Sequence, residues 1–493
     1  MEVILGIDIG TSSVKAMLLD TNDGVIGCQS KKYEVQIPKA NYAEQNPEVW
    51  WESLVQVLHR LNVQFSEKYR QIEAIGFSGQ MHGLVAVDES GNAIRPAIIW
   101  LDQRSEKQVE YLNQFLDEKE KRQVLRNHIF TGFALPSLLW IKENEQENYK
   151  KIYKIFQPKD YIRMKMTGEF GTEVTDASAT AMFDVQNRTW AWEILKKLQV
   201  NLAIFPKCSE STKIAGYITN ACSLLTGLKQ GIPVVYGAGD QQAQSIGNGV
   251  VEEGLITSNI GTGGQISTFI KTAQYDQKLR THTFCHAIDK GYTIFGATLC
   301  SGMSMKWMKD RILKVKEFDE MSRMAEDIVP GSEGVIYLPY LSGERTPYMN
   351  PKASGAFWGL KLLHDRRHMI RAVMEGVTFS LKDSLNIFEE LGIKGNKIIA
   401  SGGGAGSDVW LQMQADIFEK EVVVSEVKEQ ACLGACIVAG VGSGMFKETA
   451  EACGKFAKLN KKVYVPNTNT FHIYRKNYEM FKELYDRNSD LMA

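Results

Sequence analysis

Asp240 is the acidic residue of this sequence best placed to take a proton from a substrate. It follows the apolar run 233–236 within Gly-Ala-Gly-Asp-Gln-Gln, and a helix is expected next. An acid among glycines, between a strand and a helix, is well placed in a ligand cleft. Its carboxylate could accept the proton of a hydroxyl group. Equally, Asp240 could cap the helix expected over 241–248.

Asp8 and the turn after it could bind phosphate groups. The turn offers backbone N–H groups, the hydroxyl groups of Thr11, Ser12 and Ser13, and the cation Lys15. Such turns can cradle phosphate oxygens, and Asp8 could hold a hydrated Mg²⁺, which prefers few carboxylates together with phosphate and water. Taken alone, this segment is better explained as a hairpin turn with Lys15 in solvent.

A glycine-rich turn over 402–406 could lie against a flat or charged ligand. It follows the strand-like run 397–400 and precedes a helical pattern that Ser407 or Asp408 would cap. A tight strand-to-helix turn is the alternative. The spacing does not match G-x-G-x-x-G, and no G-x-x-x-x-G-K-S/T motif occurs, which argues against a dinucleotide-binding fold and a P-loop.

Two other strand ends carry side chains that suit a polyhydroxylated ligand. Gln80, Met81 and His82 follow an apolar strand, and Trp100 and Asp102 lie at another strand-to-helix junction. Sugars bind well to such combinations of planar side chains and polar groups. As alternatives, a lone histidine is more often structural, and Asp102 could cap a helix.

The elements that must position these turns alternate between strands and helices. Three extended segments, 3–9, 14–20 and 25–33, form an antiparallel meander whose second turn is Asn-Asp-Gly. Helical periodicity follows Asn46-Pro47, and it appears again after Asp365. Alternating strands and helices predict an α/β protein.

The first turn has a counterpart near the middle of the chain. Ile-Gly-Thr at 260–262 precedes an extended segment over 265–270, as Ile-Gly-Thr at 9–11 precedes the second strand. Two such units suggest a duplicated domain, with each copy presenting a tight turn to a shared cleft. No Pro-rich linker separates the halves, so we expect them to pack closely.

Composition argues against several classes of protein. The chain has 493 residues, of which 44% are hydrophobic and 23% charged, and its 57 Lys and Arg balance 58 Asp and Glu. This balance argues against a nucleic-acid partner, and no uncharged stretch reaches the ~20 apolar residues of a membrane span. Eight cysteines without a CxxC pair, and an N-terminus without the basic start of a signal peptide, favour a reducing, cytoplasmic setting.

Together these segments resemble the FGGY carbohydrate kinases, and most closely their xylulokinase branch. The segments that carry the resemblance span nearly the whole chain and are GIDIGTSSVKAMLLD, NYAEQNPEVWW, IGFSGQMHGLV, IIWLDQRS, GAGDQQ, NIGTGGQ, LPYLSGERTPYMNP, GAFWGLKLLHDRRHMIRAVME and SGGGAGSDVW. Each motif alone is weak, whereas this many matches in order are highly specific. The resemblance implies two actin-like ATPase (ribonuclease H-like) domains flanking a deep cleft. Residues 1–247 would hold the sugar and the catalytic aspartate, and residues 248–493 the nucleotide.

The resemblance also implies a reaction and the residues that perform it. ATP would phosphorylate a terminal hydroxyl of a ketose, in the first place D-xylulose, with Asp240 as the general base and Asp8 near Mg²⁺. The sugar would be held by Gln80, Met81, His82, Asp102 and Gln241. ATP would be bound by Thr11, Ser12, Lys15, Gly261, Thr262, Gly403, Gly404, Ala405 and Asp408.

Other acceptors and one other class of protein compete with this interpretation. Gln241 stands where xylulokinases commonly have Asn, and Ser137 stands where the family usually has Lys. The acceptor could instead be ribulose, glycerol, erythritol or a hexulose. An actin-like or heat-shock-chaperone-like nucleotide-switched binding protein could share both Ile-Gly-Thr turns. Such a protein has no use for the sugar-like set Gln80, His82, Trp100 and Asp102. A homodimer is the usual expectation for the assembly.

Overall fold

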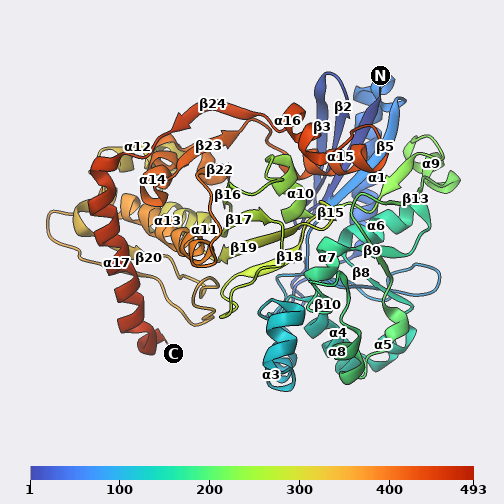
Figure 1. The fold of residues 1–493 in the computed structure, drawn as a ribbon, viewed down its shortest axis with the longest axis horizontal. Helices are drawn as coiled ribbons and strands as arrows, with labels where there is room; N and C mark the ends of the chain where they lie inside the picture. Colours follow the sequence, from blue (N-terminus) through green and yellow to red (C-terminus); the bar gives the residue numbers. More distant parts are fainter. Residues whose placement is uncertain (1, 493) are drawn as a thin grey trace.

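Two seven-stranded sheets organise the chain into two lobes (Figure 1). The structure is a computed structural model that describes residues 2–492. The strands of the N-terminal sheet are β1 (Val3–Ile9), β2 (Ser13–Asp20), β3 (Gly24–Lys32), β5 (Ile72–Gly79), β13 (Ile214–Tyr217), β14 (Pro233–Val235) and β15 (Ala238–Gly239). Those of the second sheet are β16 (Leu255–Ile260), β17 (Gly264–Ile270), β18 (His282–Cys285), β19 (Tyr292–Thr298), β22 (Lys397–Gly402), β23 (Glu421–Ser425) and β24 (Leu459–Tyr464). The expected two-domain α/β architecture is confirmed.

The two sheets repeat one arrangement of strands around their tight turns. In the first, β1 runs antiparallel to β2, with Ile9 opposite Val14, and parallel to β5. In the second, β16 runs antiparallel to β17, with Ile260 opposite Gly264, and parallel to β22. The duplication predicted from the two Ile-Gly-Thr turns is therefore present in the topology.

The N-terminal sheet is covered on both faces, which explains its continuous apolar strands. All seven residues of β1 are buried. Val3, Leu5 and Ile7 face a core that they share with helix α1 (Pro47–Gln64). Helix α1 begins as predicted, because the Asn46 side chain accepts a hydrogen bond of 3.1 Å from the Glu48 N–H.

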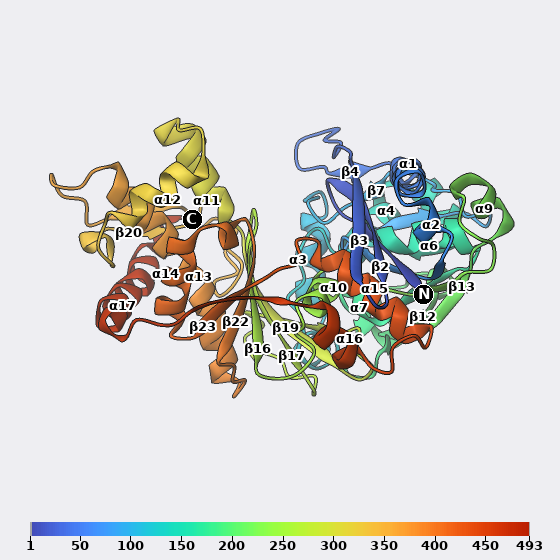
Figure 2. The same cartoon turned by 90° about the horizontal axis from the view of Figure 1, so that it is seen from above.

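A helix from the C-terminal half covers the other face of the N-terminal sheet. This helix, α15 (Gln430–Gly442), lies between the lobes beside α10 (Asp240–Gly247) (Figure 2). Its approach is so close that a Cβ on Gly6 would lie 2.3 Å from the Cys432 carbonyl oxygen, and one on Gly76 would lie 2.0 Å from that of Ala435. Glycine is needed at these two strand positions because the helix backbone occupies the space of a side chain. Packing thus joins the two halves of the chain across the expected boundary at 247/248.

Long helices pack on the second sheet and away from the N-terminal lobe (Figure 1). Helix α13 (Arg366–Glu390) begins after Asp365, whose side chain caps it. The predicted apolar stripe of α13 is buried throughout. Helices α14 (Asp408–Phe418) and α17 (Phe471–Asn488) complete this layer.

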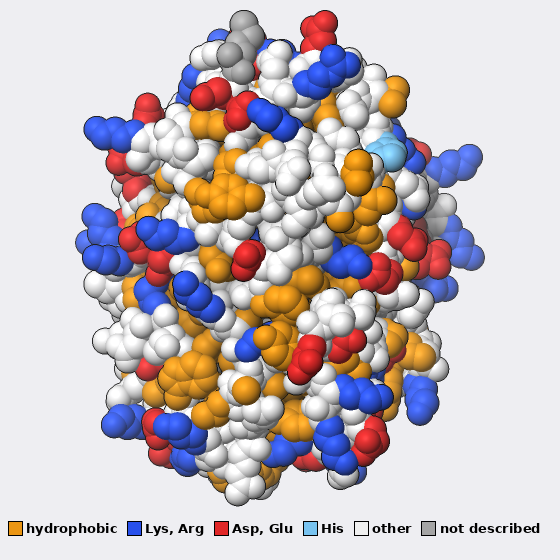
Figure 3. Space-filling model, turned by 90° about the vertical axis from the view of Figure 1, so that its right-hand side faces the viewer, with side chains coloured by type: hydrophobic (Ala, Val, Ile, Leu, Met, Phe, Trp, Pro, Cys, Tyr) orange, Lys and Arg blue, Asp and Glu red, His pale blue; other side chains and the backbone are white. Residues whose placement is uncertain are grey.

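The outer face of the N-terminal lobe carries Lys and Arg mixed with Asp and Glu, with apolar side chains between them (Figure 3). Among residues 2–492, no helix combines the length and the apolar character needed to cross a bilayer.

Candidate functional site

A cavity of about 840 Å³ between the lobes brings together residues from both halves of the chain. The predicted site residues that line it are Asp8, Lys15, Asp240, Gln241 and Ala405. They come from β1, β2, the start of α10 and the glycine-rich turn, which meet only because α10 and α15 pack between the sheets. Gln244, Asn259 and Glu429 also line this cavity, which we call the transfer cavity. Gln244 and Glu429 lie outside the motifs that predicted the site, and Asn259 lies within one of them, NIGTGGQ, without a predicted role.

Asp240 is the first residue of α10, and Gly239 occupies the cap position before it. The interpretation of Asp240 as a helix cap is therefore wrong. Its carboxyl group lines the transfer cavity instead. Burial and the negative charge of Asp8 raise the pKa of Asp240 to about 7, against hydrogen bonds from Gln241. A carboxyl group with this pKa can both accept and release a proton near neutral pH.

Asp8 faces the same cavity from the end of β1. The Ser78 hydroxyl donates a hydrogen bond of 2.8 Å to its Oδ1 atom, and burial raises the pKa of Asp8. Lys15, on the neighbouring strand, forms an ion pair of 2.5 Å with Glu429 just before α15. A plain hairpin turn would leave Lys15 in solvent, whereas here Lys15 is paired with Glu429.

No cluster of three or more His, Cys, Asp or Glu side chains within residues 2–492 could hold a metal ion. Asp8 and Asp240 both line the transfer cavity and lie close enough for the charge of Asp8 to raise the pKa of Asp240, whereas Glu429, which also lines the cavity, is paired with Lys15. This donor set fits a Mg²⁺ ion that keeps most of its water and takes further oxygens from phosphate. It does not fit a metal held by protein ligands alone.

A second cavity, of about 330 Å³, adjoins the first at Gly406, which lines both. We call it the glycine slot, because the glycines 261, 302, 403 and 404 form part of its wall. Its other lining residues include Thr262, Lys306 and the apolar side chains of Met303, Phe318 and Trp410. A flat apolar slot beside backbone amides suits a nucleoside whose phosphates lead towards Asp8.

The glycine-rich turn has the geometry that its composition predicts. Gly402 has φ of +75°, and a Cβ there would lie 2.4 Å from the Asn259 side chain. Ser407 caps α14, since its hydroxyl accepts a hydrogen bond from the Trp410 N–H at 3.4 Å. Asp408 lines neither cavity: it binds Lys462 at 2.6 Å and Tyr464 at 2.5 Å on the outside. The structure therefore does not bring Asp408 together with the other residues predicted to bind the nucleotide.

The other residues of the first turn have different roles. Ser12 is exposed and lines neither cavity. The Thr11 hydroxyl accepts a hydrogen bond of 2.9 Å from the Trp100 indole and donates one of 3.2 Å to the side-chain Oε1 atom of Gln80. Gln80 is buried, and its amide group donates to Gln45 at 2.9 Å. Gln80 and Thr11 thus link β1 and β5 to Trp100.

His82 and Trp100 line a third cavity, of about 700 Å³, between the lobes. His82 has φ of +71°, and its ring stacks on Phe133 with centroids 4.4 Å apart. Its Nδ1 lies 2.7 Å from the carbonyl oxygen of Ala179, so Nδ1 donates that bond and the neutral ring keeps Nε2 as an acceptor. Burial lowers the pKa of His82 to about 4. Met81 lies against Gly239, where an added Cβ would be 2.7 Å from its Cγ.

Both carboxylate oxygens of Asp102 accept hydrogen bonds from other parts of the protein. Its Oδ2 accepts a hydrogen bond of 2.6 Å from the Ala43 N–H, and the Arg104 guanidinium binds both of its oxygens. Asp102 is only 1% exposed. Asp102 lines none of the three cavities, so the structure does not bring it together with the other predicted sugar-binding residues. The alternative that it caps a helix is wrong, since α3 (Glu106–Phe115) begins after Ser105.

The two departures from the family pattern have local explanations. Gln241 lines the transfer cavity next to Asp240, so its longer side chain is directly exposed to any ligand there. Ser137 is buried in α4 (Ala134–Asn144) at 1% exposure. A lysine at that position would need a buried partner.

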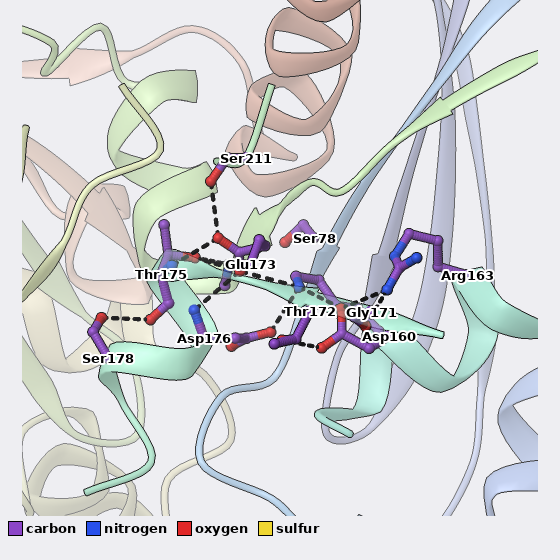
Figure 4. A network of polar contacts seen from close by, with 12 residues as sticks. Ser78, Asp160, Arg163, Gly171, Thr172, Glu173, Thr175, Asp176, Ser178 and Ser211 are labelled. Atoms are coloured by element: carbon purple, nitrogen blue, oxygen red, sulfur yellow. Dashed lines mark hydrogen bonds and ion pairs between the residues drawn. The ribbon is translucent and has the colours of Figure 1, made fainter. Parts of the chain in front are cut away.

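A buried cluster of charged residues is hydrogen-bonded to the segment just before Asp240 (Figure 4). The Lys159 ammonium, fully buried in α6 (Pro158–Thr167), binds Asp160 at 3.0 Å, Glu173 at 3.1 Å and Asp176 at 2.9 Å. The Thr175 hydroxyl donates to Glu173 and accepts the Gly239 N–H at 2.8 Å. The cluster thereby holds the residue before Asp240. Sequence reasoning missed it, although Pro-Lys-Asp and Glu-Val-Thr-Asp are unusual for segments that are otherwise buried.

Comparison with known proteins agrees with this geometry. Residues 3–247 match the N-terminal domain of the "FGGY family of carbohydrate kinases", and residues 258–443 match its C-terminal domain. The xylulose kinase of Lactococcus lactis is 36% identical over 493 residues, which cover 100% of this chain and 98% of that protein. That of Staphylococcus xylosus is 35% identical over 486 residues, with 99% and 100% covered. The structure of a ligand-bound xylulose kinase from Lactobacillus acidophilus superposes with a TM-score of 0.94 at 26% identity, covering 99% of each chain.

Proposed function

This chain belongs to the FGGY family of carbohydrate kinases, and from that premise we propose that it transfers the γ-phosphoryl group of ATP to D-xylulose, forming D-xylulose 5-phosphate. One observation carries the proposal. Asp8 and Asp240 share a cavity that continues, at Gly406, into a slot shaped for a nucleoside. A sugar hydroxyl beside Asp240 and a terminal phosphate beside Asp8 would meet within this cavity.

Asp240 is the general base of the proposed reaction. Its carboxylate takes the proton of the terminal sugar hydroxyl as the oxygen attacks the γ-phosphorus, and the bond from the γ-phosphorus to the β–γ bridging oxygen breaks so that ADP leaves. Phosphoryl transfer depends mainly on alignment and on neutralising charge, so the two lobes contribute chiefly by holding both substrates in line. The raised pKa of Asp240 makes it a stronger base than an exposed aspartate.

Asp8 is the residue that would hold Mg²⁺. When bound, this ion would neutralise charge on the phosphate oxygens. The Ser78 hydroxyl orients the carboxyl group of Asp8. Lys15 and the backbone of the first turn would contact the same phosphates from the N-terminal lobe.

The nucleotide and the sugar would enter from different sides. The nucleoside would lie in the glycine slot against Gly403 and Gly404, with Gly261 and Thr262 towards its phosphates. The sugar would lie between Asp240 and the third cavity, in contact with Met81, His82 and Trp100. Gln241, one amide longer than the usual Asn, would contact the sugar beside Asp240.

The proposal also covers the cellular compartment and the oligomeric state of the enzyme. Cys28 and Cys208 are half-buried, the other cysteines of the described chain are buried, and all are free thiols. Free thiols fit a reducing cytoplasm. A homodimer is the expected assembly, and light scattering of the purified protein measures it.

A screen of ADP release tests the substrate. The acceptors are D-xylulose, D-ribulose, glycerol, erythritol and D-fructose, and kcat/KM is compared among them. We expect D-xylulose to give the highest value. A higher value for another acceptor would replace D-xylulose in the proposal, and ATP consumption that no acceptor stimulates would favour a nucleotide-switched binding protein instead.

The Asp240→Asn variant tests the mechanism. Loss of general-base assistance should lower kcat by about 10²–10⁴-fold, while ADP binding, measured by calorimetry, stays unchanged. Asp289→Asn, at an exposed position, is the matched control. Wild-type turnover by folded Asp240→Asn protein would remove Asp240 from this role.

A further inference from the structure

Arg345 places a positive charge in the third cavity without a carboxylate partner. Its guanidinium forms no ion pair with any residue of the described chain, 2–492. The neighbouring Glu344 does not pair with the Arg345 guanidinium. Its carboxylate instead accepts hydrogen bonds from the backbone N–H groups of Leu299 at 2.9 Å and Arg345 at 2.7 Å, and from the Ser380 hydroxyl at 3.2 Å. Arg345 is half-buried in the cavity wall, and its guanidinium contacts the Phe130 ring but no carboxylate within residues 2–492, so its hydrogen-bond donors remain open to the cavity and point to a ligand.

The position of Arg345 is fixed by the second sheet. Thr346 N–H donates to the Ala297 carbonyl oxygen at 3.0 Å, and the Thr346 hydroxyl donates to that of Arg280 at 2.7 Å. From this anchored backbone the guanidinium crosses to the N-terminal lobe, where it lies 4.9 Å from the centroid of the Phe130 ring. The cation is therefore held across the space between the lobes.

The groups that face Arg345 leave its donors available. His82 and Trp100 line the same cavity from the N-terminal lobe, and burial favours the neutral form of His82. His128 also lines it, while the acids Glu106 and Glu110 lie on α3. These two carboxylates form no ion pair with Arg345. Arg345 and Nε2 of His82 thus offer hydrogen-bonding groups to a ligand in this cavity.

A short path of neighbouring residues leads from Asp240 to His82, which lines the same cavity as Arg345. Asp240 follows Gly239, Gly239 packs on Met81, and Met81 precedes His82. A sugar whose terminal hydroxyl meets Asp240 would extend along Met81 and His82. Its other end, which in a ketose carries the carbonyl group, would then approach Arg345.

We propose that Arg345 binds the end of the acceptor remote from the transferred phosphoryl group, by donating hydrogen bonds to the carbonyl oxygen and its neighbouring hydroxyl. Arg345 is thus a specificity-determining residue, and this inference rests on the proposed sugar kinase function. A guanidinium offers a planar pair of donors that suits such adjacent oxygens. Sites built to hydrogen-bond a substrate oxygen discriminate against analogues that present it differently. A sugar acid with a carboxylate at this end should bind to the same group.

Inhibition by D-xylonate, a five-carbon sugar acid, tests the proposal directly. In the wild type we expect inhibition competitive with D-xylulose. Arg345→Met should raise the inhibition constant by about tenfold or more, because a charge-assisted pair is lost. Lys352→Met is the matched control, since Lys352 is an exposed cation lining the same cavity, and it should change the constant less than twofold. Equal inhibition constants for wild type and Arg345→Met would overturn the proposal.

The ratio of kcat/KM for D-xylulose to that for xylitol gives a second readout. Arg345→Met should lower this ratio about tenfold with the KM for ATP unchanged, and Arg345→Lys should restore part of it. If Arg345 had a purely structural role, Arg345→Met would lower kcat/KM for D-xylulose and for xylitol equally, and that result would overturn the proposal. Should Arg345→Met fold poorly, Arg345→Gln serves in both assays. A wild type that phosphorylates neither acceptor contradicts the proposed function itself, whereas an active wild type with an unchanged ratio contradicts only the role of Arg345.

Discussion

Asp8 and Asp240 face one cavity from the ends of different elements, and the negative charge of Asp8 adds to burial in raising the pKa of Asp240 to about 7. The two carboxylates are close enough to interact, yet they belong to the first strand and to the helix that ends the N-terminal half. One would bind the metal and phosphate, and the other would accept the proton. Their electrostatic coupling has consequences that can be measured.

The pH dependence of turnover should report the pKa of Asp240. Because the base must be ionised, kcat/KM for the sugar should rise with pH and level off above about 7. Steady-state kinetics in buffers of constant ionic strength measure the rise. In Asp8→Asn the pKa of Asp240, followed by its carboxyl carbon NMR signal, should fall because a neighbouring charge is removed. An unchanged pKa in that variant would contradict the coupling.

Asp240→Asn should stabilise the protein at high pH. The folded-state pKa of Asp240 is raised, so between about pH 4 and pH 7 the unfolded chain ionises this group while the folded protein keeps it protonated. The wild type therefore loses stability as pH rises through this range, and the variant does not. Since the side chain is half-buried, we expect the advantage of Asp240→Asn to grow by about 1–2 kcal/mol between pH 5 and pH 8. Urea unfolding at both pH values measures it. An equal stability difference between Asp240→Asn and wild type at pH 5 and pH 8 would show that burial does not raise the pKa of Asp240.

Two adjacent glycines should respond differently to alanine. A Cβ on Gly403 would lie 3.8 Å from the Ile260 carbonyl oxygen, whereas one on Gly404 would lie 2.7 Å from the Ile260 Cβ. Gly404→Ala should therefore lower the free energy of unfolding by about 1–3 kcal/mol. Gly403→Ala should leave stability unchanged and raise the KM for ATP, because its methyl group enters the glycine slot. Thermal unfolding and ATP titration separate the two effects, and equal stability of both variants would be evidence against this packing.

Removing the buried cation of Lys159 should strongly lower the free energy of unfolding. In Lys159→Met three buried carboxylates, Asp160, Glu173 and Asp176, lose their shared partner. Removing one member of a buried charge cluster typically costs about 3–5 kcal/mol. Denaturant unfolding measures the loss, with Lys151→Met at an exposed position as control. A loss similar to that of the control would mean that the cluster contributes little to folding.

Much of the fold was readable from local patterns. The strand over 3–9 has the predicted bounds, and the helices after Asn46 and Asp365 begin where the helical periodicity predicts them. The paired Ile-Gly-Thr turns correctly indicated a duplicated architecture. These features depend on residues that are contiguous in the chain, because hydrophobic periodicity, turn chemistry and caps act over only a few positions.

Which polar groups face the ligands was decided by partners distant in sequence. Asp102 is occupied by Ala43 and Arg104, and Asp408 by Lys462, although both aspartates lie in family motifs at promising turns. Conversely, Arg345 is left without a carboxylate partner among the described residues. Local sequence specified the strands, helices and turns and the kinds of side chain at their ends. Only folding, which brings distant segments together and removes polar groups from water, determined which of those side chains satisfy one another and which stay available for a substrate.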